Sequence, residues 1–194
     1  MMALVTGGAS SGKSAFAEQL AVALGGELVY LATMRPYGKE GARRVERHRA
    51  QRAGKGFGTV ECYGDLRDAQ AVRRLDGTTV LLEDLGNLVA NELFGEDGHA
   101  RASEAFAGVA ALAHGCAHLV VVGNEIGCDG FSYEAETRSY QEELGRIACE
   151  VAALSDLVVE CVAGVPVAVK APAGGLFPAG FAWPCTTAAL GGRP

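Results

Sequence analysis

The sequence has few aromatic residues and no long hydrophobic run. Aromatic side chains make up 7% of the 194 residues, although 49% of the residues are hydrophobic. Alanine, valine, leucine and glycine must therefore supply most of the packing, which is typical of a doubly wound α/β sheet. No apolar run reaches the ~18–20 residues that a membrane span needs, so we expect no membrane span. The length fits one domain with a substantial core.

A metal-binding cysteine pattern is also absent. The six cysteines form no C-x-x-C pair and show no zinc-ligand spacing. Because residues 1–5 run directly into a glycine-rich motif, we expect no secretory signal, and we interpret the cysteines as reduced, mostly buried thiols of a cytoplasmic protein. The net charge of −6 disfavours a nucleic-acid partner, although basic residues gather between Arg35 and Lys55.

One motif near the N-terminus points to nucleotide chemistry. The stretch Gly7-Gly8-Ala9-Ser10-Ser11-Gly12-Lys13-Ser14 has the form G-x-x-x-x-G-K-S of a phosphate-binding loop, or P-loop. An apolar run at 3–5 precedes it and a helical pattern at 15–24 follows, which is the strand–loop–helix context that a P-loop requires. The glycines let successive backbone N–H groups point at an anion, and the helix adds its positive end.

The last two residues of the motif have specific expected roles. We expect Lys13 to reach the β- and γ-phosphates and the Ser14 hydroxyl to bind Mg²⁺. The alternative is a glycine-rich turn before an unrelated helix, which both flanks disfavour. The sequence therefore predicts a protein that binds a nucleoside triphosphate.

Apolar runs alternate with helical patterns along the rest of the chain. We predict strands at 28–32, 59–62, 79–82, 119–122, 157–162 and 165–169, helices at 40–52, 65–75, 85–94, 103–114 and 134–154, and a break at 54–58. This order predicts an α/β fold with a mostly parallel sheet and helices on both faces, in one P-loop nucleotide-binding domain over residues 1–170. The last two strands predict a hairpin or strand pair, and hence an antiparallel C-terminal edge. Residues 171–194, rich in glycine and proline, predict an irregular tail.

Polar residues follow several of the predicted strands. They are Thr6, Thr33, Glu61, Glu83 and the pair Asn124-Glu125. The carboxyl ends of parallel strands are where open α/β sheets bind ligands. A P-loop protein also needs a carboxylate on the metal side, usually at the end of a buried strand, and we favour Glu83 over Asp84 for that role. The alternative is that both acids stabilise the N-terminus of the next helix.

His48 lies in a strongly basic helical pattern, Arg43-Arg44-Val45-Glu46-Arg47-His48-Arg49. Neighbouring cations suit a polyphosphate and favour the neutral imidazole. A neutral imidazole can attack phosphorus and form a covalent nucleotidyl intermediate. The alternative is a solvated basic helix in which the histidine is one polar residue among many, and these residues alone favour it.

Taken together, these motifs resemble the bifunctional adenosylcobinamide kinase/adenosylcobinamide-phosphate guanylyltransferase family of cobalamin synthesis. The matching stretches are 4–14, Tyr30-Leu31-Ala32-Thr33, Arg44-Val45-Glu46-Arg47-His48-Arg49, Thr59-Val60-Glu61, Leu81-Leu82-Glu83 with Asn91, Asn124-Glu125-Ile126-Gly127 and Gly164-Val165-Pro166-Val167-Ala168-Val169-Lys170. A P-loop alone is not specific to this family. A P-loop followed by Y-x-A-T and then by a basic R-x-x-x-H-R helix is far more specific.

The resemblance implies a RecA-like P-loop fold and two reactions on small-molecule substrates. A γ-phosphate from ATP or GTP goes to the aminopropanol hydroxyl of adenosylcobinamide, with Mg²⁺ as cofactor. His48 then takes GMP covalently from GTP, releases pyrophosphate and passes the GMP to adenosylcobinamide phosphate. The resemblance also implies a homotrimer with sites near the subunit contacts. The nucleotide-binding residues that it implies outside the P-loop are Leu31, Ala32, Thr33, Arg49, Glu61 and Glu83.

Some segments depart from the family pattern and indicate a divergent branch. Residues 52–57 replace R-P-x-x-W, residues 127–131 replace a more apolar loop, and Ala148 stands where asparagine is usual. Two other functions stay open. One is a relative, or an ordinary P-loop kinase, with only one of the two activities. The other is a nucleotide-dependent switch protein, which needs no reactive histidine, so His48 counts against it.

Overall fold

The computed structural model describes most of the 194 residues. The described residues are 1–36, 38, 41, 43, 45–46, 50, 52–67, 75–95, 102–127, 130–172 and 181. His48 and Arg49 lie outside them, as do most of the predicted tail at 171–194 and parts of the predicted helices at 40–52 and 65–75. These predictions stay predictions.

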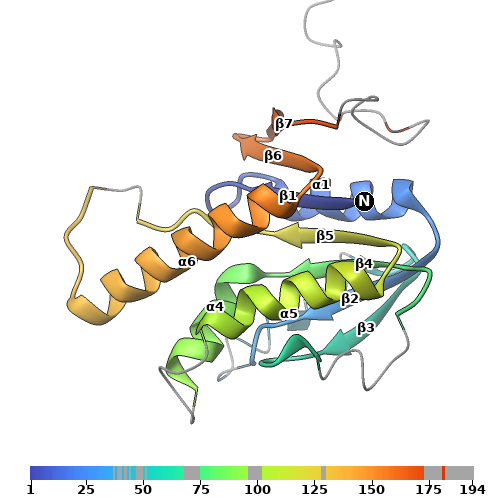
Figure 1. The fold of residues 1–194 in the computed structure, drawn as a ribbon. Coiled ribbons are helices and arrows are strands. Elements are labelled where there is room, and N and C mark those ends of the chain that lie inside the picture. Colours follow the sequence, from blue (N-terminus) through green and yellow to red (C-terminus); the bar gives the residue numbers. More distant parts are fainter. Residues whose placement is uncertain are drawn as a thin grey trace, which may run out of the picture.

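In the described part of the chain, seven strands form one sheet. They are β1 (Met2–Thr6), β2 (Glu27–Ala32), β3 (Phe57–Glu61), β4 (Thr78–Glu83), β5 (His118–Val122), β6 (Leu157–Val162) and β7 (Val165–Lys170). Their order across the sheet is β3-β2-β4-β5-β1-β6-β7 (Figure 1). Neighbouring strands pair in parallel from β3 to β6, and β7 pairs antiparallel with β6. The mostly parallel sheet and the antiparallel C-terminal edge predicted from the sequence are confirmed.

Helices cover both faces of this sheet (Figure 1). The helix α1 (Lys13–Leu24) packs on one face, and α4 (Leu85–Phe94), α5 (Ala102–Gly115) and α6 (Ala135–Leu154) pack on the other. Ala3 and Val5 of β1 join the core under α1, whereas Met2 and Leu4 join the core under the other three helices. Because both faces of β1 are buried, its sequence is an uninterrupted apolar run. None of the helices in the described ranges has the length and hydropathy of a membrane span.

Two elements begin two residues earlier than the sequence predicts, whereas the other differences in boundary are of one residue. The helix α1 begins at Lys13, because the last two residues of the P-loop motif already form its first turn. The strand β3 begins at Phe57, inside the segment 54–58 that predicted a break. Phe57 packs against the core under α1, and Gly58 pairs in parallel with Val29. Sheet pairing therefore overrides the weak strand preference of glycine.

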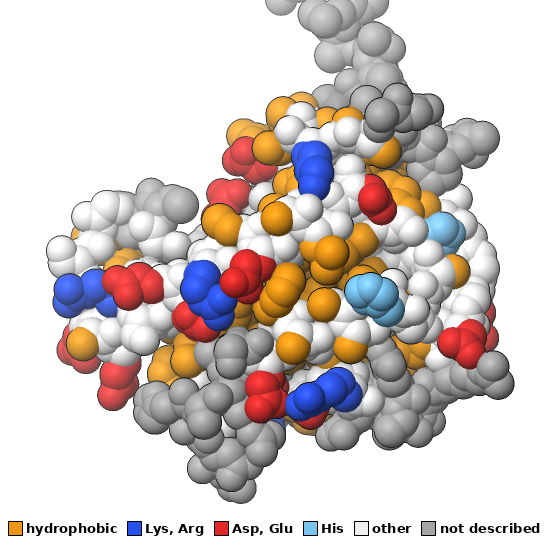
Figure 2. All heavy atoms as spheres, in the orientation of Figure 1, with side chains coloured by type: hydrophobic (Ala, Val, Ile, Leu, Met, Phe, Trp, Pro, Cys, Tyr) orange, Lys and Arg blue, Asp and Glu red, His pale blue; other side chains and the backbone are white. Residues whose placement is uncertain are grey.

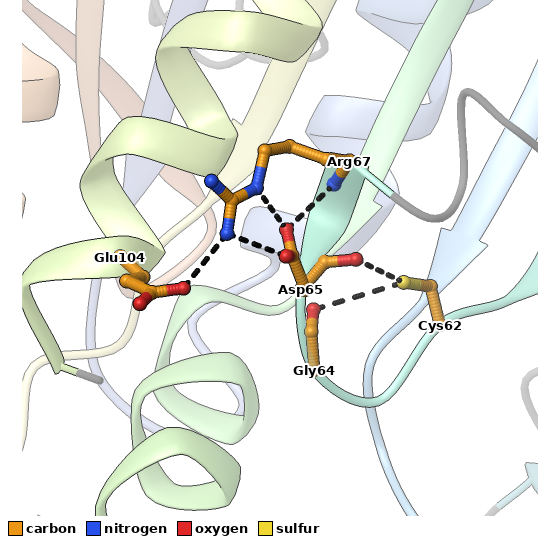
Figure 3. Close-up of polar contacts among 5 residues, drawn as sticks. All are labelled: Cys62, Gly64, Asp65, Arg67 and Glu104. Carbon is orange, nitrogen blue, oxygen red and sulfur yellow. Dashed lines mark hydrogen bonds and ion pairs between the residues drawn. The ribbon is translucent and has the colours of Figure 1, made fainter. Parts of the chain in front are cut away.

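A polar cluster connects the chain after β3 to α5 (Figure 3). The Asp65 carboxylate accepts hydrogen bonds from the Arg67 backbone N–H (3.0 Å) and from its guanidinium (2.5 and 2.6 Å). The same guanidinium donates to Glu104 Oε2 on α5 at 2.8 Å. The Cys62 thiol lies 3.7 Å from the Gly64 carbonyl oxygen and 3.5 Å from that of Asp65. Exposed ion pairs of this kind add little stability, but they orient the turn that follows β3.

The face of the molecule that α5 and α6 cover exposes both charged and hydrophobic side chains (Figure 2). Charged side chains of both signs are spread along α6, where Arg146 pairs with Glu143 (2.5 Å) and Glu150 (2.7 Å). Hydrophobic side chains gather over β6 and β7, at the top of the view. The exposed valines of these two strands are Val162, Val165, Val167 and Val169. The β7 edge of the sheet therefore exposes several apolar side chains.

Candidate active site

The P-loop forms the turn between β1 and α1. Gly12 is the N-cap of α1 and has a left-handed backbone (φ 89°). Gly7 leaves no room for a side chain, since a Cβ there would lie 2.5 Å from the Cys161 carbonyl oxygen. The Lys13 ammonium donates to the Gly8 carbonyl oxygen (3.0 Å), so its charge lies across the loop. The loop thus places the N-terminus of α1 next to the Lys13 ammonium, and both can bind an anion there.

Ser14 and Glu83 meet beside the P-loop. Ser14 lies in the first turn of α1, Glu83 ends β4, and the Ser14 hydroxyl donates to Glu83 Oε1 at 2.6 Å. The strand β5 separates β1 from β4 in the sheet, so the packing of α1 over β4 and β5 brings these residues together. The Glu83 side chain is buried (7% exposed). Burial raises its pKa to about 7, and the hydrogen bond from Ser14 opposes that shift.

This pair of oxygen donors fits Mg²⁺. A hydroxyl and a carboxylate are hard ligands, and P-loop proteins hold Mg²⁺ through such groups while water and phosphate oxygens fill the other positions. Ser14 and Glu83 are therefore the residues that could hold the ion beside a phosphate chain.

Thr33 and Asn91 fix the backbone after β4. Thr33 is fully buried, and its hydroxyl donates to the Asp84 carbonyl oxygen (2.8 Å) and accepts from the Asp84 N–H (2.7 Å). The Thr33 N–H donates to the Glu83 carbonyl oxygen (3.0 Å). Asn91 on α4 in turn donates to the Thr33 carbonyl oxygen (2.8 Å). Thr33 therefore positions Glu83, while its contact with a nucleotide stays a prediction.

Asp84 caps α4. Its carboxylate accepts hydrogen bonds from the backbone N–H (2.7 Å) and the side-chain amide (2.9 Å) of Asn87. Such a cap satisfies an unpaired donor at the helix N-terminus. Asp84 thus has the helix-stabilising role that was the alternative for both acids, whereas Glu83 faces Ser14.

Two cations lie on the α1 face of the site, next to β2. Arg52 is buried (7% exposed), and its guanidinium lies 3.3 Å from the centroid of the Tyr30 ring. Lys55 forms an ion pair with the buried carboxylate of Glu18. Burial raises the pKa of the Tyr30 hydroxyl above its usual range, so Tyr30 is a neutral surface for cation–π contact with Arg52. In the sequence, both cations belong to the group of basic residues between 35 and 55, but nothing there distinguished Arg52 or Lys55 from the others.

One cavity of about 810 Å³ joins these groups. The predicted site residues that line it are Ala9, Ser10, Ser11, Gly12, Lys13, Ser14, Ala32, Glu61 and Glu83. Of the described site residues, Gly7, Gly8, Leu31 and Thr33 are not in its lining. The lining residues that sequence reasoning missed include Tyr30, Arg52, Lys55, Asn87 and Tyr140. They come from four separate segments, so no local motif could have identified them together.

We expect a Glu83→Gln variant to lose Mg²⁺-dependent phosphoryl transfer and yet to be more stable than the wild type above pH 7. The pKa of Glu83 rises from 4.5 to about 7 on folding, so the folded state holds this proton more tightly than the unfolded state does. Stability should therefore fall as the pH rises from about 4.5 to about 7. At ~1.4 kcal/mol per pH unit, the full loss is on the order of 3 kcal/mol. Glutamine cannot ionise and avoids this loss.

Denaturant unfolding at pH 5 and pH 8 in a chelator would measure the difference. Glu142→Gln, which neutralises an exposed carboxylate on α6, is the matched control. A Glu83→Gln protein with the same pH dependence of stability as the control would contradict the effect of burial. Unchanged Mg²⁺ dependence of activity would assign the metal to Asp84 or to another carboxylate.

Comparisons with known proteins agree on one family. Residues 3–169 match the family described as cobinamide kinase / cobinamide phosphate guanyltransferase. The bifunctional adenosylcobalamin biosynthesis protein CobU of Escherichia coli (strain K12) is 32% identical over 183 residues, which cover 88% of this chain and 100% of that protein. The bifunctional adenosylcobalamin biosynthesis protein CobP of Pseudomonas aeruginosa is 30% identical over 170 residues, covering 88% of this chain and 98% of that protein. The family match runs from β1 into β7 and includes the whole described site.

Proposed function

Because the chain belongs to the cobinamide kinase / cobinamide phosphate guanyltransferase family, we propose that it catalyses two consecutive steps of cobalamin biosynthesis. It phosphorylates adenosylcobinamide with ATP or GTP, and it transfers GMP from GTP to adenosylcobinamide phosphate. The chain is thus an enzyme of the transferase class, a kinase and a nucleotidyltransferase. The observation that supports phosphoryl transfer at this site is the 2.6 Å contact between Ser14 and Glu83 beside the P-loop.

In the kinase reaction, the P-loop binds the phosphate chain of the nucleotide. The acceptor hydroxyl oxygen forms a bond to the γ-phosphorus, the bond to the bridging oxygen breaks, the nucleoside diphosphate leaves and the hydroxyl proton is released. Lys13 and the N-terminus of α1 stabilise the charge on the transferred group. Ser14 and Glu83 would hold Mg²⁺, and the bound ion would neutralise negative charge on the phosphate chain.

In the guanylyl transfer, His48 is the proposed nucleophile. An imidazole nitrogen attacks the α-phosphorus of GTP and pyrophosphate leaves. A phosphate oxygen of adenosylcobinamide phosphate then attacks the same phosphorus, the P–N bond breaks, and adenosylcobinamide-GDP is formed. Support comes from the resemblance of residues 44–49 to the family's basic helix. Further support comes from Arg52 and Lys55, two cations that follow this segment and line the cavity.

Two labels test both reactions on the wild-type protein. ATP labelled at the γ-phosphate should label adenosylcobinamide, and GTP labelled at the α-phosphate should label the protein through an acid-labile, base-stable phosphoramidate. Transfer of the γ-phosphate without labelling of the protein would indicate a kinase with one activity. Nucleotide binding without either transfer would indicate a switch protein and would overturn the proposal.

We also propose that the protein is a homotrimer in the cytoplasm, as the family resemblance implies. The support for self-association is the edge strand β7, which carries exposed valines. Proteins usually cover or protect a sheet edge of this kind, because an unpaired apolar edge promotes association.

A further inference from the structure

The cavity crosses the carboxyl edge of the sheet, and the described cations of its lining gather at one end. Its lysine and arginine lining residues in the described ranges are Lys13, Arg52 and Lys55, all near α1 or β2. On the face that α4 and α6 cover, the lining residues are Asp84, Gly86, Asn87 and Tyr140, with Asn124 at the strand edge. Glu18, which pairs with Lys55, and Glu61 also line the cavity, so the charge that can bind a polyphosphate comes from Lys13, Arg52 and the P-loop. The second end has no lysine or arginine among its described lining residues and carries one carboxylate, Asp84.

Asn124 supplies an unused amide between the two ends. It follows β5, which lies between β1 and β4 in the sheet, so Asn124 stands between the P-loop and Glu83. The Gly123 N–H donates to the Val5 carbonyl oxygen (2.8 Å), and this bond ties the end of β5 to the strand that leads into the P-loop. The Asn124 side chain is half-buried and lines the cavity, and it makes no hydrogen bond with any residue in the described ranges. Its amide is therefore available to a bound molecule.

Three polar groups converge on Gly86 in the first turn of α4. A Cβ on Gly86 would lie 3.0 Å from Asn124 Nδ2, 3.1 Å from the Tyr140 hydroxyl oxygen and 3.4 Å from Asp84 Oδ1. The Tyr140 hydroxyl donates to the Gly86 carbonyl oxygen (3.1 Å). Burial raises its pKa to about 12, with a smaller contribution from Asp84, so this hydroxyl stays protonated at neutral pH. The missing side chain lets an amide, a hydroxyl and a carboxylate approach one another.

This set of groups suits a neutral molecule that carries a hydroxyl. The amide of Asn124 and the hydroxyl of Tyr140 can each donate and accept a hydrogen bond, and the carboxylate of Asp84 accepts one from an alcohol. In phosphoryl transfer, the attacking and leaving oxygens lie roughly in line on opposite sides of the γ-phosphorus. With the phosphate chain on the cationic side, the acceptor oxygen must approach from the other end of the cavity.

We propose that Asn124, Tyr140 and Asp84 form the acceptor subsite of the kinase reaction, which binds the hydroxyl-bearing end of the molecule to be phosphorylated. Asn124 and Asp84 hydrogen-bond the acceptor hydroxyl, and Tyr140, held at Gly86, closes the subsite from α6. The assignment of this subsite rests on the proposed function, since it presupposes phosphoryl transfer to an alcohol. It implies that the acceptor and the nucleotide are recognised by different residues.

Steady-state kinetics of Asn124→Ala and Tyr140→Phe test the subsite, with adenosylcobinamide varied at saturating nucleotide. We expect the KM for adenosylcobinamide to rise about 10-fold in Asn124→Ala and about 3-fold in Tyr140→Phe, as for the loss of one neutral hydrogen bond. Nucleotide affinity and labelling of the protein by α-labelled GTP should stay at the wild-type level, because the acceptor takes no part in either. Ser139→Ala, an exposed neighbour of Tyr140 on α6, is the control. Gly86→Ala should also raise this KM, since its Cβ displaces Asn124 and Tyr140 and alanine favours the helix.

The outcomes separate this subsite from the proposed function. A wild-type protein that phosphorylates no adenosylcobinamide contradicts the proposed function itself. With an active wild type, an unchanged KM for adenosylcobinamide in Asn124→Ala and Gly86→Ala would overturn the subsite. Weaker nucleotide binding in Asn124→Ala would place the amide on the phosphate chain and would also overturn it.

Discussion

A His48→Asn protein is expected to phosphorylate adenosylcobinamide at close to the wild-type rate while retaining no α-label from GTP and making no adenosylcobinamide-GDP. The kinase step needs a phosphate-binding loop, a metal and an acceptor hydroxyl, and none of these requires a covalent histidine. Guanylyl transfer through an intermediate does require a nucleophile, and an amide cannot replace imidazole in that step. The two activities should therefore separate in one variant. The measurements are γ-label transfer to adenosylcobinamide and α-label on the denatured protein.

A second histidine gives a matched control for this variant. His114 is exposed near the end of α5, so His114→Asn should keep both activities. Undiminished labelling of His48→Asn would move the nucleophile elsewhere, with Cys62 or another histidine as the next candidate. Loss of both activities in a folded His48→Asn protein would instead make His48 a general residue of the nucleotide site.

A Lys13→Ala protein is expected to bind nucleotide much more weakly and to lose kinase activity by about 10²-fold or more. The variant removes the cation that lies across the P-loop, 3.0 Å from the Gly8 carbonyl oxygen. We expect the Lys13 ammonium to make a charge-assisted contact with the β- and γ-oxygens of the nucleotide, and this contact should gain strength as the transferred group develops charge in the transition state. Initial rates with γ-labelled ATP and equilibrium binding of GTP measure the two effects.

The control for Lys13→Ala is another lysine far from the cavity. Lys170 ends β7 and donates to carbonyl oxygens of Ala152 and Ala153 at the end of α6, so Lys170→Ala should leave nucleotide binding unchanged. Full kinase activity in a folded Lys13→Ala protein is incompatible with the P-loop assignment.

The sequence by itself determined the P-loop and its flanking strand and helix, because the features that define them are local. Residues 7–14 are contiguous, and the glycines, the lysine, the serine and the helix N-terminus all act within one turn of the chain. The buried run at 79–82 likewise marked a strand and placed Glu83 at its carboxyl end. Alternating strands and helices then left few arrangements other than a mostly parallel sheet.

The tertiary structure alone decided which side chains meet across the cavity. Hydrophobic periodicity identifies strands but does not order them, and only the position of β5 between β1 and β4 places Asn124 between the P-loop and Glu83. Thr33 follows a strand like a ligand-binding residue, yet its hydroxyl bonds to the Asp84 backbone because β4 lies beside β2. Contacts such as that of Tyr140 with Gly86 join distant segments. They depend on several elements packing at once, so no local pattern in the sequence specifies them.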